Sequence, residues 1–181
     1  MNKSHPSGID VHLNDIPDNL ANLVIELLDI KNFKVKMEAR DTLLSMGKSI
    51  IPQMDKLLSA NNELLRLEVA KIVELIADQQ AIPVLIKLLN DPEFDIRWIA
   101  AEGLIKIGRK SIVPILKIIR DGEGSFFLNK GAHHVLQSLL SEKEKKVLMP
   151  LLLSLDDHLE AGETAPVEAS VALKKTFRCK T

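Results

Sequence analysis

A period of 31 residues in the middle of the sequence constrains the fold more than any other feature. Two residue types keep this interval in phase: three prolines, Pro52, Pro83 and Pro114, and four alanines, Ala39, Ala70, Ala101 and Ala132. Residue types that recur together indicate one structural unit copied along the chain. Each unit buries its apolar surface only by stacking on its neighbours.

Residues 79–109 show the unit most completely. Apolar residues from Pro83 to about Asn90 predict a first helix, and Asp91-Pro92 predicts its end. A second helix is expected up to Gly108, because apolar positions recur at intervals of three and four rather than two. One face of this second helix carries Ile96, Ala100, Leu104 and Ile107.

The flanking segments repeat the unit less regularly. Phe33 to Gly47 matches Phe94 to Gly108 almost position for position, whereas Asp121-Gly-Glu-Gly-Ser125 replaces the Asp-Pro turn in the fourth unit. Ser141-Glu-Lys-Glu144 has the spacing of a capping box and predicts a helix through Leu155. A last helix is expected from Ala165 to Phe177.

These patterns predict an all-α fold, a right-handed α-α superhelix or solenoid of about five helical hairpins. The hairpins are expected at residues 16–47, 48–78, 79–109, 110–141 and 142–178, the last being a degenerate end unit. Residues 1–15 are interpreted as a flexible N-terminal arm.

Composition narrows the functional classes. The chain has 181 residues, 46% of them hydrophobic, and a formal net charge of −1, so it lacks the global positive charge that attracts nucleic acid. Its one cysteine, Cys179, has no partner for an intrachain disulfide, which favours a cytoplasmic location. No signal peptide or membrane-spanning run is visible, so no membrane association is expected.

The third unit contains Pro83, Asp91-Pro92, Ile96-Arg97, Ala100-Ala101, Leu104 and Ile107-Gly108. With these residues it resembles HEAT repeats, in particular the short bacterial class first associated with phycobilisome lyases. The resemblance implies that second helices line a concave side, where such proteins usually hold partners. It also implies a ladder between repeats, formed by a turn aspartate and an arginine six residues later.

Asp91 and Arg97 fit that ladder. The ladder is expected to be interrupted elsewhere. Six residues before Arg66 the sequence has Ala60, and six residues before Leu128 it has Gly122. Lys36 also has no aspartate at that offset.

An apolar row on the second helices is the first candidate site. Trp98 and its repeat equivalents Leu67 and Met37 form the row, and Glu102 and Lys106 share the helical face of Trp98. A protein partner of unknown identity is expected to bind there, because an exposed tryptophan beside methionine is typical of interface anchors. The alternative is that the row packs between adjacent repeats.

A cationic cluster is the second candidate: Arg109, Lys110, Lys117 and Arg120. Aligned along one edge, these residues would engage phosphate or an acidic partner, which makes nucleic-acid binding the main alternative function. A solvated face with cations near helix C-termini is the ordinary explanation. The near-neutral charge and the single tryptophan argue against nucleic acid.

Two further motifs were weighed. Asp121-Gly-Glu-Gly-Ser-Phe-Phe127 is either a recognition loop or the start of a helix whose phenylalanines are buried. His133-His134 is not interpreted as a metal site, because adjacent helical residues point about 100° apart. The two histidines are expected to be solvated or partly packed.

No catalytic motif, metal site or cofactor is predicted. The sequence therefore favours a non-enzymatic interaction scaffold. A phycobilin-lyase-like, enzyme-associated role follows from the resemblance alone.

Overall fold

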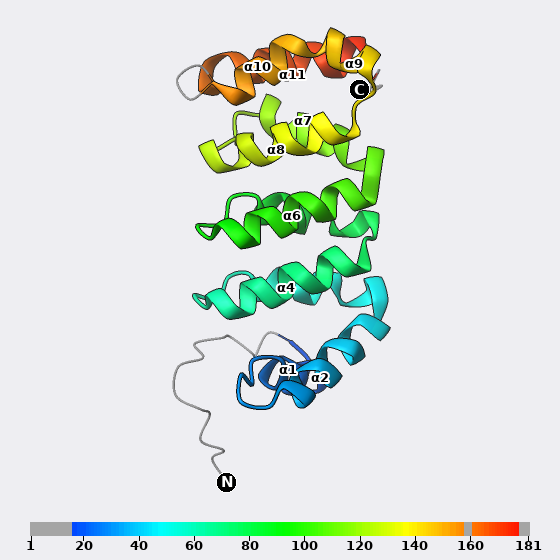
Figure 1. The fold of residues 1–181 in the computed structure, drawn as a ribbon, viewed down its shortest axis with the longest axis vertical. Helices are drawn as coiled ribbons and strands as arrows, with labels where there is room; N and C mark the ends of the chain where they lie inside the picture. Colours follow the sequence, from blue (N-terminus) through cyan, green and yellow to red (C-terminus); the bar gives the residue numbers. More distant parts are fainter. Residues whose placement is uncertain (1–15, 158–160, 178–181) are drawn as a thin grey trace.

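The computed structural model describes residues 16–157 and 161–177. All helices and turns in this part of the chain pair into layers stacked along one axis, and it contains no strand (Figure 1). The predicted all-α solenoid is therefore confirmed, while the sense of its superhelix stays a prediction. Residues 1–15, interpreted as an arm, and Cys179 lie outside the described residues.

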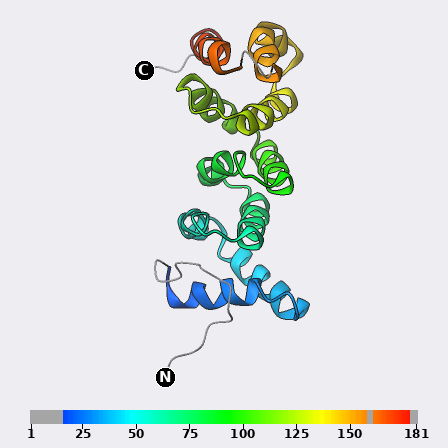
Figure 2. The same ribbon diagram turned by 90° about the vertical axis from the view of Figure 1, so that its left-hand side faces the viewer.

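The helices fall into two columns (Figure 2). The helices that come first in their pairs are α1 (Asp18–Leu27), α3 (Ile51–Leu57), α5 (Ile82–Leu88) and α7 (Ile112–Arg120). Their partners are α2 (Phe33–Ser45), α4 (Glu63–Ile76), α6 (Phe94–Ile107) and α8 (Phe126–Leu139). The last layer holds α9 (Glu142–Val147), α10 (Met149–Asp156) and α11 (Ala161–Lys175). Short 3-10 turns, η2 (Gly47–Ile50), η3 (Gln79–Ala81) and η4 (Gly108–Ser111), join successive layers.

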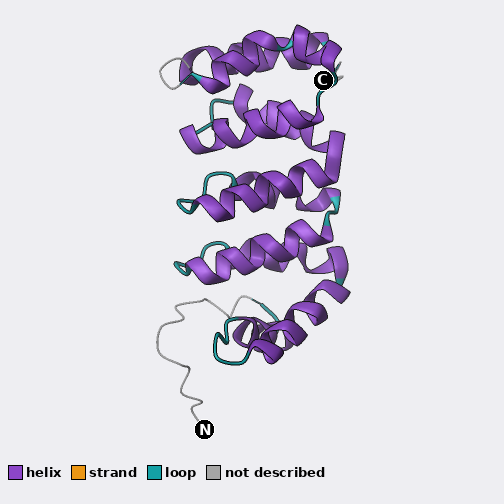
Figure 3. Cartoon of the chain, in the orientation of Figure 1, coloured by secondary structure: helices purple, strands orange, loops and turns teal. Residues whose placement is uncertain are grey.

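Local sequence signals set the helix ends. The side chains of Asn32 and Asn62 accept hydrogen bonds from backbone N–H groups of the first turns of α2 and α4. Gly47 and Gly108 follow α2 and α6 with φ of 58° and 84°, a region that glycine enters without strain. The turns that join first to second helices in the middle layers gather along one edge of the solenoid (Figure 3).

A continuous apolar core runs between the two columns. Three members of the predicted face of α6, Ile96, Ala100 and Leu104, are fully buried, whereas Ile107 is only partly buried. Gly103 lies where α6 meets α5, since a Cβ there would come within 3.0 Å of the Leu85 side chain. The core is therefore made by contacts between helices of successive pairs as well as within each pair.

The last layer reverses the order of its two columns. The chain enters it through α10, which packs against α8 in the second-helix column, and returns through α11, which packs against α7 (Figure 2). The sequence predicted one helix through Leu155, but the helix breaks at Leu148, because Pro150 has no N–H to continue the helical hydrogen bonds. The final helix also starts earlier than expected, at Ala161, with Pro166 inside it.

A buried carboxylate ties the first two layers together. Glu68 on α4 has no exposed surface, and its Oε1 lies 2.9 Å from Lys36 Nζ and 3.3 Å from Lys71 Nζ. Its Oε2 accepts a hydrogen bond from Arg40 on α2. Burial by itself would raise the pKa of Glu68, but the hydrogen bonds from Lys36 and Arg40 outweigh burial and lower it.

We expect Glu68→Gln to lower the free energy of unfolding by about 3 kcal/mol at pH 7, because it leaves Lys36 and Arg40 partly buried without their anion. The folded pKa of Glu68 lies below the unfolded value, so this stabilisation is full above the unfolded pKa and is lost as the pH falls through the folded pKa. Urea unfolding of the wild type and the variant, at pH 7 and at lower pH, measures this difference in the free energy of unfolding. The matched variant Glu38→Gln, at an exposed pair with Lys34, should change stability by less than about 0.5 kcal/mol.

The predicted capping box at the start of α9 is confirmed. Ser141 and Glu144 bond reciprocally, and Glu144 also binds Arg109 of η4, with Oε2 3.0 Å from Nη1. The hydrogen bonds from Arg109, and then those from Ser141, lower the pKa of Glu144 to about 2. This carboxylate therefore joins the last layer to the turn before α7.

Glu144→Gln keeps a capping side chain and removes only its charge. We expect it to lower the free energy of unfolding by about 1 kcal/mol at pH 7. The difference from the wild type should be full above pH 4.5 and shrink as the pH falls towards about 2, since the folded pKa is the lower one. A difference that grows at low pH would contradict this assignment. Glu142→Gln, in the same turn but 84% exposed, is the control.

Candidate functional site

Exposed aromatic side chains gather where α6 and α8 begin. Phe94 is 65% exposed, Trp98 49%, Phe126 50% and Phe127 39%. Between the two helices lies a hollow of about 320 Å³, which we call the aromatic groove. It is lined by these four residues and by Arg97, Ala101, Lys130, Gly131 and His134.

The rings of the groove contact one another across the two layers. The Trp98 ring centroid lies 6.3 Å from that of Phe94, one helical turn earlier, and 5.0 Å from that of His134 on α8. The Phe126 and Phe127 centroids are 5.6 Å apart. His134 Nε2 also lies 3.1 Å from Glu102 Oε1. The aromatic side chains are thus held by neighbours and still present surface to solvent.

Arg97 stands inside this aromatic cluster. Its guanidinium carbon is 4.1 Å from the centroid of the Phe127 ring and 5.8 Å from that of Phe94. Its Nη1 donates to the backbone carbonyls of Asp91 at 2.7 Å and Pro92 at 2.6 Å. Two carbonyls therefore fix the orientation of the guanidinium plane.

A ladder contact between repeats is present at Asp91, and the interruption expected at Arg66 is wrong. The carboxylate of Asp91 binds Arg66 of the preceding layer, with Arg66 Nε 2.7 Å from Oδ2 and Nη2 3.3 Å from Oδ1. The hydrogen bond to Asp91 raises the pKa of Arg66. The ladder thus joins an arginine to the turn of the next layer, because an arginine reaches forward along the stack while its own turn offers it only carbonyls.

Asp91→Asn should lower the free energy of unfolding by about 2 kcal/mol, because Arg66 is largely buried and would lose its counter-ion. The asparagine oxygen can still accept from the backbone N–H of Glu93, now 3.0 Å from Asp91 Oδ1, so the loss isolates the ion pair. Thermal unfolding measures it. Asp121→Asn, at an exposed position in the next turn, should leave the melting temperature unchanged.

The structure places the predicted apolar row across three layers. Met37 is half-buried and its sulfur lies 3.6 Å from Arg40 Nη1. Leu67 packs against the core and shares a hollow of about 160 Å³ with Phe94. Trp98 is the exposed member of the row, and its ring contacts lead towards α8.

The two charged residues predicted beside Trp98 bridge to different layers. Glu102 meets His134 of α8, and Lys106 Nζ lies 3.2 Å from Glu74 Oε1 of α4. These contacts turn the side chains of Glu102 and Lys106 in different directions, so the two do not form one patch. Trp98 and Glu102 are therefore brought together with His134, and Lys106 is turned towards the preceding layer.

The interpretation of Phe126 and Phe127 as the start of a buried face is wrong. Ser125 caps α8 by accepting from Leu128 N at 3.2 Å, and the buried face begins only at Leu128. Both phenylalanines lie in the first turn of α8 and stay exposed, as Phe94 does at the start of α6. Periodicity within a helix does not show how far neighbouring layers cover its first turn.

The predicted cationic cluster is divided between partners. Arg109 binds Glu144, and Arg120 Nε lies 2.7 Å from Asp121 Oδ1. The hydrogen bond from Arg120 lowers the pKa of Asp121. Lys110 and Lys117 are exposed. Two of the four predicted cations are therefore neutralised by carboxylates.

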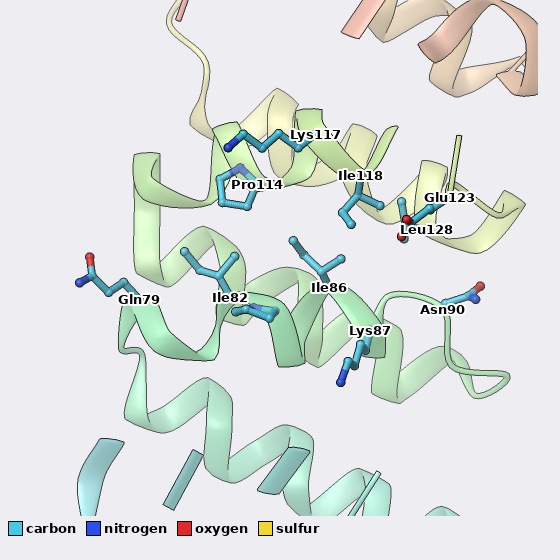
Figure 4. Close-up of a pocket in the computed structure, with 11 residues that line it drawn as sticks. Gln79, Ile82, Ile86, Lys87, Asn90, Pro114, Lys117, Ile118, Glu123 and Leu128 are labelled. Carbon is cyan, nitrogen blue, oxygen red and sulfur yellow. The ribbon is translucent and has the colours of Figure 1, made fainter. Parts of the chain in front are cut away.

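A larger hollow, of about 770 Å³, lies between α5 and α7 in the first-helix column, and Figure 4 shows its lining residues. Its walls are mainly apolar, with Ile82, Ile86 and Ile118, and Lys117 and Glu123 stand at its margin. The periodic Pro83 and Pro114 also line it, along with Gln79, Lys87, Asn90 and Leu128. In the sequence these prolines mark the repeat, but their period gives no indication of the hollow.

His133 and His134 are partly packed, as expected, and burial lowers the pKa of His133. Within residues 16–157 and 161–177, no group of three or more histidine, cysteine or acidic side chains is placed to hold a metal ion. Over the same residues, no helix has the length and apolar character required to cross a bilayer.

Comparison with known proteins gives one family match, over slightly less than half of the chain. Residues 51–137, from α3 to α8, match the family model described as HEAT repeats. No curated protein and no solved structure matches the chain. The match covers the layers that carry the aromatic groove.

Proposed function

We propose that this chain, whose residues 51–137 match HEAT repeats, is a non-enzymatic HEAT-repeat scaffold that binds a protein partner on the face of its second helices. The aromatic groove, with Trp98 at its centre, is the proposed contact. HEAT repeats often mediate protein interactions, which supports the class of function.

One observation carries the proposal: four exposed aromatic side chains and a half-buried arginine lie together at the junction of α6 and α8. Leaving large apolar rings in water is unfavourable, and burying them against a partner recovers about 25 cal/mol for each Å² removed from water. Aromatic residues and arginine are also the side chains most enriched at the centres of protein interfaces.

The two alternatives from the sequence have less support. The first alternative is that the apolar row packs between repeats. Leu67 does pack against the core, but Trp98 keeps 49% of its surface exposed. Nucleic-acid binding through the cationic cluster would need cations free to replace counter-ions, and Arg109 and Arg120 already bind carboxylates.

Trp98→Ala tests the proposal. We expect the free energy of unfolding to fall by no more than about 1 kcal/mol, because the ring is half-exposed and loses only its contacts with Phe94 and His134. Capture of specific proteins from the native cell, followed by mass spectrometry, should fail for this variant.

Ile30→Ala is the matched control, since Ile30 is 76% exposed and lies in the turn between α1 and α2. It should capture the same proteins as the wild type. The proposal is wrong if Trp98→Ala captures the same proteins as the wild type. A large loss of stability in that variant would instead assign Trp98 a packing role.

A further inference from the structure

We propose that the aromatic groove binds an acidic segment of the protein partner, and that the Arg97 guanidinium pairs with a carboxylate of that segment. This inference rests on the proposed function and adds the chemistry of the partner. It follows from an interruption of the ion-pair ladder beside the groove.

The ladder supplies Arg66 with a counter-ion and leaves Arg97 without one. Arg66 binds Asp91, which lies 25 positions later in the turn of the next layer. The same offset from Arg97 leads to Gly122, which carries no side chain. Arg97 makes no ion pair with any described residue.

The acidic residues on either side of Gly122 are directed elsewhere. Asp121 binds Arg120, and Glu123 lines the hollow between α5 and α7, in the first-helix column. Neither carboxylate forms an ion pair with Arg97. The altered turn of the fourth layer thus removes the anion that the regular repeat would provide.

The other two basic side chains of the groove have acidic neighbours within the chain. Lys130 Nζ lies 2.7 Å from Asp156 Oδ1, and His134 Nε2 lies 3.1 Å from Glu102 Oε1. Of the three, Arg97 alone is reached by no described carboxylate. Among the cations that line the groove, Arg97 is therefore the one that forms no ion pair with a described carboxylate.

Arg97 is also prepared to receive an anion. Nη1 is occupied by the carbonyls of Asp91 and Pro92, whereas Nε and Nη2 make no hydrogen bond to the described residues. The Phe127 ring, 4.1 Å away, limits hydration of one face of the guanidinium. A fixed and poorly hydrated guanidinium edge recognises the planar geometry of a carboxylate.

The remaining lining favours a peptide over a nucleic acid. A nucleic-acid backbone gains affinity from several phosphates neutralised in a row, whereas Arg97 is the one cation of the groove that forms no ion pair with a described residue. The small residues Ala101 and Gly131 lie among the rings and leave room for an apolar side chain. The matching segment therefore carries an aspartate or glutamate close to an apolar residue.

Selection of short random peptides displayed on phage, with the full-length chain as bait, tests the inference. The wild type should enrich peptides that combine an acidic with an apolar residue. Arg97→Gln should keep the apolar preference and lose the acidic one, and Trp98→Ala should enrich neither. Lys110→Gln, which makes the same charge change at an exposed position outside the groove, should select like the wild type.

Affinities are then measured with synthetic, tryptophan-free versions of the enriched peptides. Trp98 is the single tryptophan of the chain, so its fluorescence reports on the groove directly. Replacing the peptide glutamate by glutamine should weaken binding to the wild type roughly tenfold or more. The same replacement should have little effect on binding to Arg97→Gln.

The glutamate and glutamine peptides are compared by their binding to the wild-type protein. This comparison still tests the inference if Arg97→Gln fails to fold. Trp98-dependent binding of peptides without an acidic preference would overturn this inference and leave the proposed function standing. An absence of any Trp98-dependent peptide would overturn both. Salt-sensitive fluorescence quenching by oligothymidylate, without peptide binding, would assign the groove to single-stranded nucleic acid and overturn the inference.

Discussion

Burial of apolar surface between successive layers is the constraint on which the rest of this structure depends. No pair of helices in the stack encloses its own apolar residues, and the fully buried Leu65, Leu85 and Leu104 belong to one core that passes from layer to layer. This interaction is strong and has no preferred direction. Apolar burial therefore makes the layers stack, whereas directional contacts determine how one layer is aligned on the next.

Polar contacts between layers supply that alignment. Glu68 gathers Lys36 and Arg40 across the first two layers, and Asp91 receives Arg66 across the next two. Buried or partly buried ion pairs tolerate little displacement, because an uncompensated charge in a poorly hydrated site is unfavourable. Arg97 has no such carboxylate among the described residues, because the turn of the fourth layer has Gly122 at the position of Asp91. The aromatic groove lies at that irregularity.

The regular middle of the fold was predictable in detail. The 31-residue period, the capping residues and Gly108 give the second helix of the third unit its observed end, Ile107. Prediction was weaker at the last layer, where the order of the columns is reversed. Sequence showed that this unit is degenerate, but the reversal depends on α11 fitting against α7, a contact between segments distant in the chain.

The candidate site was predicted only in part. Trp98 was singled out by its position on the helical wheel, and its exposure supports that choice. For Phe126 and Phe127 the sequence left two alternatives, a recognition loop or a buried helix start, because a helical pattern indicates which residues share a face but not how far neighbouring layers cover the first turn. The sequence also did not predict that Arg97 forms no ion pair with the described residues, because the ladder contact of Asp91 is made with Arg66.

The sequence by itself determined the helical repeat, the family it resembles and the apolar faces that hold the layers together, because these follow from spacing along one chain. Only the tertiary structure decided which arginine meets which aspartate, which aromatic rings stay in solvent and which helix closes the stack. Those outcomes depend on how one layer is placed against the next. That placement is set by side chains far apart in sequence, and no local period records it.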